Sequence, residues 1–242
     1  MTRRGRALKV GILGGMGPAA TADFYTKLVR STPAVTDQDH VPVVIWADPT
    51  IPDRTAALLG QGPDPSPWLE QGAHALVLAG AELLAIPCNT AHAFLDTVRS
   101  AASPVHVLDM VAETAAEVAR LQPGATVGVL ATTGTLKAEL YQHALAGRGL
   151  TPLVPDDTTQ LGVMSAIRHV KAGGDLAEAR QLTAPALQSL YRSGATAVVA
   201  ACTEIPLLLQ SSDVVDATAV LARAVVRRAL ADVRAIEGNP CH

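Results

Sequence analysis

Residues 10–18 read VGILGGMGP, an apolar run that ends in a glycine-rich turn and a proline. A short apolar run followed by glycines and a helix-compatible segment is typical of a strand–loop–helix unit in an α/β fold. Residues 127–135 read VGVLATTGT and align with the first stretch at an offset of 117 residues. The repeat indicates two related α/β units in one chain.

The alternation of apolar runs and helical segments extends along the rest of the chain. It predicts a mostly parallel sheet with helices on its faces. We expect two pseudosymmetric Rossmann-like (flavodoxin-like) domains with a ligand cleft between them, formed by residues 1–104 plus 216–242 and by residues 105–215. The expected strands are 8–13, 41–46, 83–86, 105–108, 126–130, 151–154 and 197–200, and the expected helices are 19–30, 67–79, 90–100, 111–121, 136–146, 159–171, 176–192 and 217–233.

Two cysteine motifs follow expected strands. Residues 87–92 read PCNTAH and residues 201–206 read ACTEIP, which places Cys88 and Cys202 114 residues apart. This offset nearly equals that of the glycine-rich repeat, so the two thiols are expected at equivalent places in the two domains. Ligands of open α/β sheets bind at the carboxyl ends of the strands, and we therefore expect both thiols to face the cleft.

Composition excludes several classes of function. The chain has 242 residues, a net charge of -3 and 3% aromatic residues, which argues against nucleic acid as a partner. It has no apolar run of the roughly 18 residues that a membrane span needs. The three cysteines, without a recognisable secretion signal, indicate reduced thiols and a cytoplasmic location. Cys241, in the tail with His242, is interpreted as incidental, and no histidine spacing predicts a metal site.

Two opposed thiols suit proton transfer at carbon, because one can remove a proton while the other returns one to the opposite face. A free thiol titrates near 8.5, so a dominant thiolate at neutral pH needs about 2.7 kcal/mol of stabilisation. A helix N-terminus supplies about 0.3–1 kcal/mol, at most roughly 2. Hydrogen bonds from Asn89, Thr90 or Thr203 and a nearby cation must therefore contribute the rest.

Other segments are suited to holding an anion. The turn that contains Gly15 and Met16 offers backbone N–H groups before a helix, and its counterpart adds threonine hydroxyls. Arg54 is suited to bidentate carboxylate binding, although a surface pair with Asp53 is the alternative interpretation. Lys171 is a second candidate, or a solvated lysine at a helix end. The Gly/Pro-rich loop 60–67 is either a surface connector or a lid. The threonines of the counterpart turn are Thr132, Thr133 and Thr135.

Two polar residues beside the cysteines have alternative interpretations. His92, four residues after Cys88, either supports the thiol or packs inside a helix. Glu204 either caps a helix or takes part in proton transfer. Three other classes of function stay open: a hydrolase with a Cys88–His92 pair, a nucleotide-binding module in which residues 15–20 match G-x-G-x-x-A, and a binding protein without catalysis. The acidic residue that such a module needs would fall near Asp37 or Asp39, in an expected loop.

These motifs together resemble the aspartate/glutamate racemase superfamily, and most closely its aspartate racemase branch. The glutamate racemase branch is less similar, because its second cysteine motif usually continues Cys-Thr-His. The matching pieces occur in family order between about residues 8 and 210: GGMGP at 14–18, IPDRT at 51–55, CNTAH at 88–92, ATTGT at 131–135, VKAG at 170–173 and CTEIP at 202–206.

The resemblance implies a cofactor-independent amino-acid racemase, commonly a homodimer, that acts on an acidic amino acid, with aspartate as the first candidate and glutamate as the next. It implies that Cys88 and Cys202 are the opposed acid–base pair and that Arg54 and Lys171 bind the side-chain carboxylate. Residues for the α-carboxylate and amino group are implied to be Asn89, Thr90, Thr132, Thr133, Thr135 and Thr203.

One position departs from the family pattern. Asp48 precedes Pro49, where the resemblance leads us to expect asparagine. An acidic side chain there would disfavour a second carboxylate on the substrate, which leaves the substrate open. The other members considered are glutamate, broad-specificity amino-acid and hydantoin racemases, decarboxylases and maleate-type isomerases.

Overall fold

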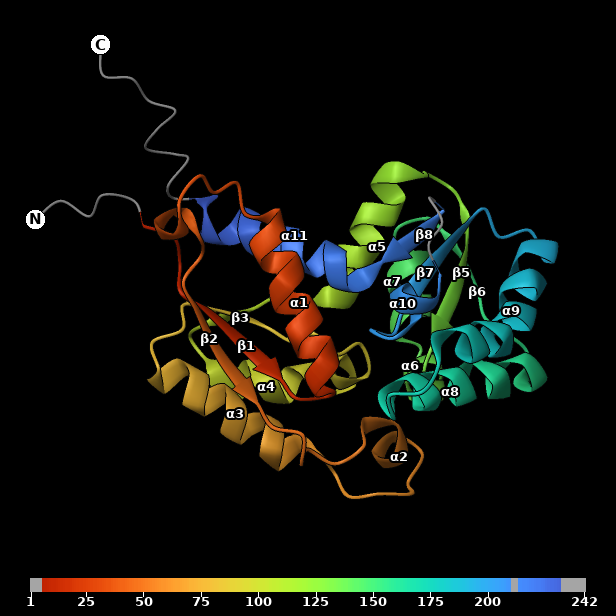
Figure 1. Cartoon of the computed structure of the whole chain (residues 1–242), viewed down its shortest axis with the longest axis horizontal. Coiled ribbons are helices and arrows are strands. Elements are labelled where there is room, and N and C mark those ends of the chain that lie inside the picture. Colours follow the sequence, from red (N-terminus) through yellow and green to blue (C-terminus); the bar gives the residue numbers. More distant parts are fainter. Residues whose placement is uncertain (1–5, 210–212, 232–242) are drawn as a thin grey trace, which may run out of the picture.

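The computed structural model describes residues 6–209 and 213–231 (Figure 1). One sheet contains β1 (Val10–Gly14), β2 (Val43–Ala47), β3 (Leu83–Ala85) and β4 (His106–Val107). The other contains β5 (Thr126–Ala131), β6 (Thr151–Leu153), β7 (Ala197–Ala201) and β8 (Val214–Asp216). The strand orders are β2-β1-β3-β4 and β6-β5-β7-β8, and all their pairings are parallel. The identical orders confirm the expected pair of α/β units.

Helices cover both faces of each sheet (Figure 1). In the first half these are α1 (Pro18–Ser31), α2 (Arg54–Leu58), α3 (Ser66–Leu78), α4 (Leu95–Ala102) and α5 (Met110–Leu121). In the second half they are α6 (Thr133–Lys137), α7 (Leu140–Ala146), α8 (Asp157–Lys171), α9 (Leu176–Arg192), α10 (Ile205–Leu208) and α11 (Ala217–Ala229). Short 3₁₀ segments, η1 (Asp37–Asp39) and η2 (Thr90–Phe94), complete the described elements.

Alternating side chains along the central strands build three cores. Val10 and Ile12 of β1 face α1, α5 and α11, whereas Leu13 faces α3 and α4. On β7, Val198 faces α8 and α9, whereas Val199 faces the opposite side. Every residue of β1 and β7 is buried, as expected of parallel strands covered on both faces. The carboxyl ends of β3 and β7 are thereby held in equivalent positions.

Most elements agree with the expected ones, but two expected helices are wrong as continuous helices. The segment 90–100 begins as the 3₁₀ helix η2 and becomes α-helical only at Leu95. The segment 136–146 is interrupted at Glu139, whose φ of 52° lies in the left-handed region, so α6 and α7 are separate. Strand β8 was not expected, and the end of the expected helix 217–233 lies outside the described residues.

Four of the longer helices begin directly after an aspartate. Asp109, Asp156, Asp175 and Asp216 each accept a hydrogen bond from a backbone N–H in the first turn of α5, α8, α9 and α11. Such N-caps satisfy donors that lack a partner within the helix. Among the described residues, no helix is long and apolar enough to cross a bilayer.

Candidate active site

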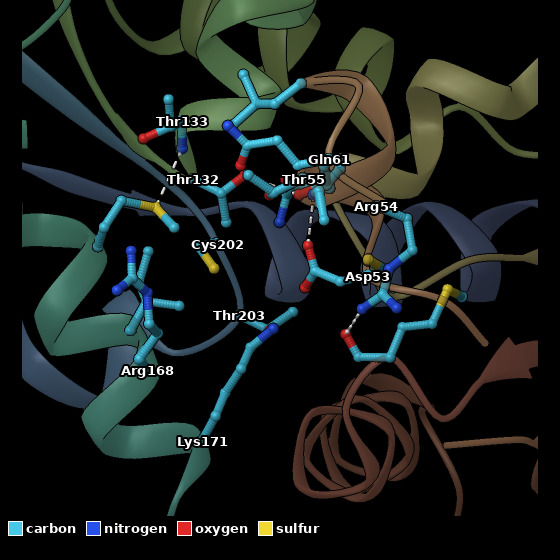
Figure 2. A pocket seen from close by; sticks show the side chains of 18 residues that line it. Asp53, Arg54, Thr55, Gln61, Thr132, Thr133, Arg168, Lys171, Cys202 and Thr203 are labelled. Carbon is cyan, nitrogen blue, oxygen red and sulfur yellow. Dashed lines mark hydrogen bonds between the residues drawn. The ribbon is translucent and has the colours of Figure 1, made fainter. Parts of the chain in front are cut away.

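The two cysteines line one cavity of about 390 Å³. Cys88 follows β3 after two residues, and Cys202 directly follows β7, the equivalent strand of the other sheet. Both thiols are free, with 7% and 6% of their residue surface exposed. The structure therefore brings the two motifs together at the carboxyl ends of paired strands, on one cavity between the two sheets. Figure 2 shows this cavity with Cys202 near its centre.

Cys202 has a carboxylate as its immediate partner. Its Sγ donates to Oε2 of Glu204 over 2.9 Å, and the hydroxyl of Thr203 donates to the same oxygen over 3.0 Å. Burial, and then the negative charge of Glu204, raise the pKa of the Cys202 thiol well above its usual range, although Lys171 opposes the shift. Cys202 therefore rests as a thiol.

Lys171 supplies the nearby cation. It ends α8 and extends toward Thr203 and Asp53 (Figure 2), lining the 390 Å³ cavity. Partial desolvation lowers the pKa of Lys171, but Coulomb interactions with Cys202, Glu204 and Cys88 outweigh it, so the pKa is raised overall. The ammonium group thus keeps its charge and is available to an anion in the cavity.

Arg54 lines the same cavity but is already engaged. Its Nη1 donates to the carbonyl oxygens of Ile51 and Pro52 over 3.0 and 2.8 Å, and its Nη2 donates to that of Met16 over 3.3 Å. Only 8% of the residue is exposed, and Nε has no partner among the described residues. Arg54 therefore joins the loops that follow β1 and β2. It does not form the surface pair with Asp53, whose carboxylate caps α2 through the N–H of Ala56.

Three threonines form a closed set of hydroxyls between the two halves. The Oγ1 atoms of Thr90, Thr132 and Thr135 lie 2.9–3.0 Å from one another. Thr90 and Thr132 line the cavity, but Thr135 is fully buried and lines neither cavity described here. Thr133 also lines the cavity, and its N–H contacts Sδ of Met164 over 3.2 Å. The three hydroxyls thus hold Thr90 of the Cys88 motif against the turn after β5.

His92 lies away from the thiol cavity. Its Nε2 accepts the N–H of Met110 over 3.0 Å, so the neutral ring carries its proton on Nδ1, which donates to the carbonyl oxygen of Cys88 over 2.9 Å. Burial lowers the pKa of His92. Both ring nitrogens are occupied by backbone groups, which supports the packing interpretation and removes the base that a Cys88–His92 hydrolase needs.

The acidic residue at the cavity is Asp53 and not Asp48. The carboxylate of Asp48 accepts from the N–H and hydroxyl of Thr50 over 2.8 and 2.6 Å, and Asp48 lines neither cavity. Asp53 lines the thiol cavity, and its carboxylate points toward the centre (Figure 2). The expectation that Asp48 disfavours a second carboxylate on the substrate is therefore wrong. The carboxylate of Asp48 is hydrogen-bonded within a local turn and does not line either cavity.

A second cavity of about 600 Å³ lies beside the first. It contains the turn with Gly15 and Met16, the start of α1, and the side chain of Glu204. Met16, Asp53, Arg54, Lys171 and Thr203 line both cavities. The anion-binding candidates of the first repeat and the partner of Cys202 consequently face a common space next to the thiols.

Sequence reasoning missed several residues of the thiol cavity. Arg168 and Met164 lie on the face of α8 that carries Lys171, at helical spacings of three and seven residues. That periodicity was the available signal. Leu59 and Gln61 come from the end of α2 and the loop after it, so the Gly/Pro-rich segment does contribute to the site. Among the described residues, no cluster of three or more metal-ligating side chains occurs.

A nucleotide-binding module is not supported by the same geometry. The turn after β1 does precede α1, but Asp37 and Asp39 lie in η1, before β2. Asp39 accepts from the N–H groups of Val35 and Thr36, so its carboxylate is used in a local turn. The acid that directly follows the second strand is Asp48, and its carboxylate is likewise held in a local turn by Thr50.

Comparison with known proteins identifies the class. The Asp/Glu/Hydantoin racemase family matches residues 13–225, and the chain belongs to this family. It is therefore an isomerase that acts on amino acids.

Three relatives illustrate the range of similarity. An aspartate racemase structure from Picrophilus torridus is 32% identical, with a TM-score of 0.81 over 93% of this chain and 94% of that chain. The broad specificity amino-acid racemase RacX of Bacillus subtilis is 29% identical over 92% of this chain and 98% of its own length. A glutamate racemase structure from Francisella tularensis, in complex with D-glutamate, shares the fold at 18% identity, with a TM-score of 0.65 over 90% of this chain and 80% of that chain.

Proposed function

We propose that this protein is a cofactor-independent aspartate racemase in which Cys88 and Cys202 exchange the α-proton from opposite faces of the substrate. The observation that carries the proposal is the pair of buried thiols on one cavity, each after the equivalent strand of its sheet. Pseudosymmetric strand ends present two groups of the same chemistry to one substrate, which suits a reaction that inverts one stereocentre. Membership of the racemase family supports this reaction class.

The proposed reaction moves one proton in each of two steps. The thiolate of one cysteine takes the α-proton, and the electron pair of the C–H bond remains on carbon as a carbanion. The thiol of the other cysteine then gives its proton to the opposite face and becomes a thiolate. The raised pKa of Cys202 favours its resting role as the proton donor. In the reverse direction Cys202 must lose its proton, and Glu204 is placed to accept a hydrogen bond from it.

The cavity contains groups that suit an acidic amino acid. We assign the substrate's α-carboxylate to Asn89 and to the hydroxyls of Thr90, Thr132, Thr133 and Thr203, with Thr135 holding the threonines in place. We assign the side-chain carboxylate to Lys171, assisted by Nε of Arg54 and by the turn with Gly15 and Met16. Fixed donors and cations stabilise the negative charge that develops on the carbanion. Asp53 offers an acceptor for the substrate's ammonium group.

Glutamate is the second candidate substrate. Arg168 lies on the wall of the thiol cavity away from Arg54 (Figure 2), so the cavity offers a cation beyond the pair that we assign to aspartate. A side chain that is longer by one methylene reaches further along this wall. The similarity to a broad specificity racemase agrees with this alternative.

We further propose the biological context that the resemblance implies. The mechanism needs two reduced thiols, which suits the reducing cytoplasm. The division into residues 1–104 plus 216–242 and residues 105–215 is supported by α11, which packs against α1 of the first of these units. The homodimer remains a prediction that light scattering of the purified protein tests.

The deciding experiment follows exchange and racemisation separately. Wild type, Cys88→Ala and Cys202→Ala are incubated in heavy water with each enantiomer of aspartate and of glutamate, without added cofactor. We expect each variant to lose at least ~10²-fold in racemisation, because each direction needs both an acid and a base. Each variant is expected to keep α-proton exchange with one enantiomer at most.

Cys241→Ala is the matched control, because it removes a thiol that lies outside the described residues and is not assigned to the site. It should racemise like wild type. The proposal fails if wild type exchanges the α-proton of no amino acid. It also fails if Cys202→Ala racemises normally, because Cys202 would then supply neither the acid nor the base.

A further inference from the structure

Tyr141 lies outside both cavities yet contacts the Cys88 motif. It belongs to α7 in the second half and is completely buried. Its hydroxyl donates to Oδ1 of Asn89 over 2.5 Å, which joins α7 to the residue directly after Cys88. Burial raises the pKa of Tyr141 far above its usual value, so the phenol keeps its proton and remains a donor. The contact therefore holds the acceptor end of the Asn89 amide.

The other end of that amide is free. Asn89 is 3% exposed and lines the thiol cavity, and its Nδ2 has no partner among the described residues. A buried NH₂ group without an acceptor is costly, and native proteins leave few of them. Because Oδ1 is bound by Tyr141, the amide offers the cavity a donor and no acceptor. A carboxylate satisfies that donor, whereas an ammonium group cannot.

We propose that Tyr141 is a positioning residue that holds the NH₂ group of Asn89 toward the substrate's α-carboxylate. This inference rests on the proposed function and deepens it, because it names the residue that turns the NH₂ end of the Asn89 amide toward the carboxylate. If the amide turned over, its oxygen would face the carboxylate and repel it. Without the phenol, the productive orientation leaves Oδ1 buried and unpaired.

Substitution of Tyr141 by phenylalanine tests the inference. We expect KM for aspartate to rise about tenfold, which corresponds to about 1.4 kcal/mol, while kcat changes little because binding is lost equally in ground and transition states. Tyr191→Phe is the matched control: it removes the same atom from a hydrogen bond to Asp213, and Tyr191 lines neither cavity. It should leave KM unchanged.

Coupling to Asn89 separates positioning from a structural role. In an Asn89→Ala background, Tyr141→Phe should raise KM no further, because the amide that it orients is gone. An effect of equal size in both backgrounds would mean that Tyr141 acts only through packing, and would overturn the inference. Asn89→Asp leaves Tyr141 its acceptor but replaces the donor with an anion. It should weaken binding more than Asn89→Ala does, and the opposite order would also overturn the inference.

Calorimetric binding of aspartate distinguishes this inference from the proposed function. The titration uses the Cys88→Ala, Cys202→Ala double variant, which cannot turn over, with and without Tyr141→Phe. If wild type does not racemise aspartate but the Tyr141 change still weakens binding tenfold, only the proposed function fails. If wild type racemises and Tyr141→Phe binds and reacts normally, only the inference fails. If no aspartate binds, both fail.

Discussion

At the scale of single residues, the chemistry open to a polar group depends on the hydrogen-bond partners that it already has. Arg54 is suited by type to a carboxylate, but three backbone carbonyl oxygens occupy its Nη atoms. The nitrogens of His92 contact backbone groups and not the sulfur four residues away. Cys202 is the opposite case, because its sulfur contacts the carboxylate of Glu204, two residues on. That contact gives the two thiols different environments despite the symmetry of the fold.

We predict that Glu204→Gln changes the pH dependence of the reaction. Burial remains, but the negative charge that raises the pKa of Cys202 is removed, so the thiolate becomes easier to form. The limb of the kcat/KM–pH profile that reports Cys202 should therefore move to lower pH. Initial rates with both enantiomers across pH measure this shift.

Glu178→Gln, at an exposed position in the first turn of α9, is the matched control for that profile. It should leave both limbs in place. An unchanged profile in Glu204→Gln, or movement of the Cys202 limb to higher pH, would show that Glu204 does not control the thiol.

At the scale of elements, the site depends on short helices that meet across the cleft. Each cysteine is followed by a short helix: the five-residue η2 after Cys88 and the four-residue α10 after Cys202. Neither has the length to supply a strong helix dipole, so side-chain partners matter more than the sequence argument assumed. One such contact is that of α2 with α6, where Gly134 faces Thr55.

We predict that Gly134→Ala disturbs substrate binding. The added Cβ would lie 2.8 Å from both Cα and Oγ1 of Thr55, so backbone must move. Alanine improves helix propensity by about 1 kcal/mol, but overpacking of this kind costs about 1–3 kcal/mol, so we expect a net loss of stability. KM should rise, because α2 and α6 both line the cavity. Thermal unfolding and initial-rate kinetics measure the two effects.

The control for this change is Gly147→Ala at the end of α7. The added Cβ there meets the carbonyl oxygens of His143 and Ala144, at 3.3 and 3.9 Å, and φ is -62°, which suits alanine. Stability should change by less than about 1 kcal/mol, with KM unaltered. An unchanged KM in Gly134→Ala would contradict the assigned role of the α2–α6 contact.

At the scale of the whole molecule, the two halves share a core. One cluster of buried side chains includes Ile12 of β1, Val129 of β5, Val199 of β7 and Leu221 of α11. Helices α1, α5 and α11 lie between the two sheets (Figure 1). The position of each cysteine motif relative to the other is therefore held by apolar packing behind the cavity, and we expect the two halves to unfold together.

We predict that Leu221→Ala destabilises both halves at once, by about 2–5 kcal/mol, because it opens a cavity in the shared core. Tryptophan fluorescence reports the first half, which contains Trp46 and Trp68, and far-UV circular dichroism reports the whole chain. The two denaturation curves should coincide and shift together. Leu161→Ala, at a 69% exposed position of α8, should change stability by less than about 0.5 kcal/mol. Separate transitions would contradict a single cooperative unit.

Much of the fold could be predicted from the sequence, because strands and motifs are encoded by residues that are close together in the chain. Apolar runs of strand length and the repeat at 10–18 and 127–135 predict the two sheets, and they are confirmed by the identical strand orders. Of the proposed site residues, those in short motifs were found. Arg168 and Tyr141 were not found, since neither stands in a motif that carries chemistry by itself. Asp53 was treated only as a partner of Arg54, because its direction depends on how α2 begins.

The sequence by itself determined the fold class, the family and the two thiols, because strand patterns and motif spacing are properties of neighbouring residues. Only the tertiary structure decided the rest: that Thr90 meets Thr132 and Thr135, that Tyr141 reaches Asn89, and that Asp48 turns away from the site. These contacts join positions 42 to 52 residues apart, or depend on the direction of one side chain in a turn. Such contacts form because the two sheets pack against a common core. They cannot be predicted from the spacing of residues along the chain.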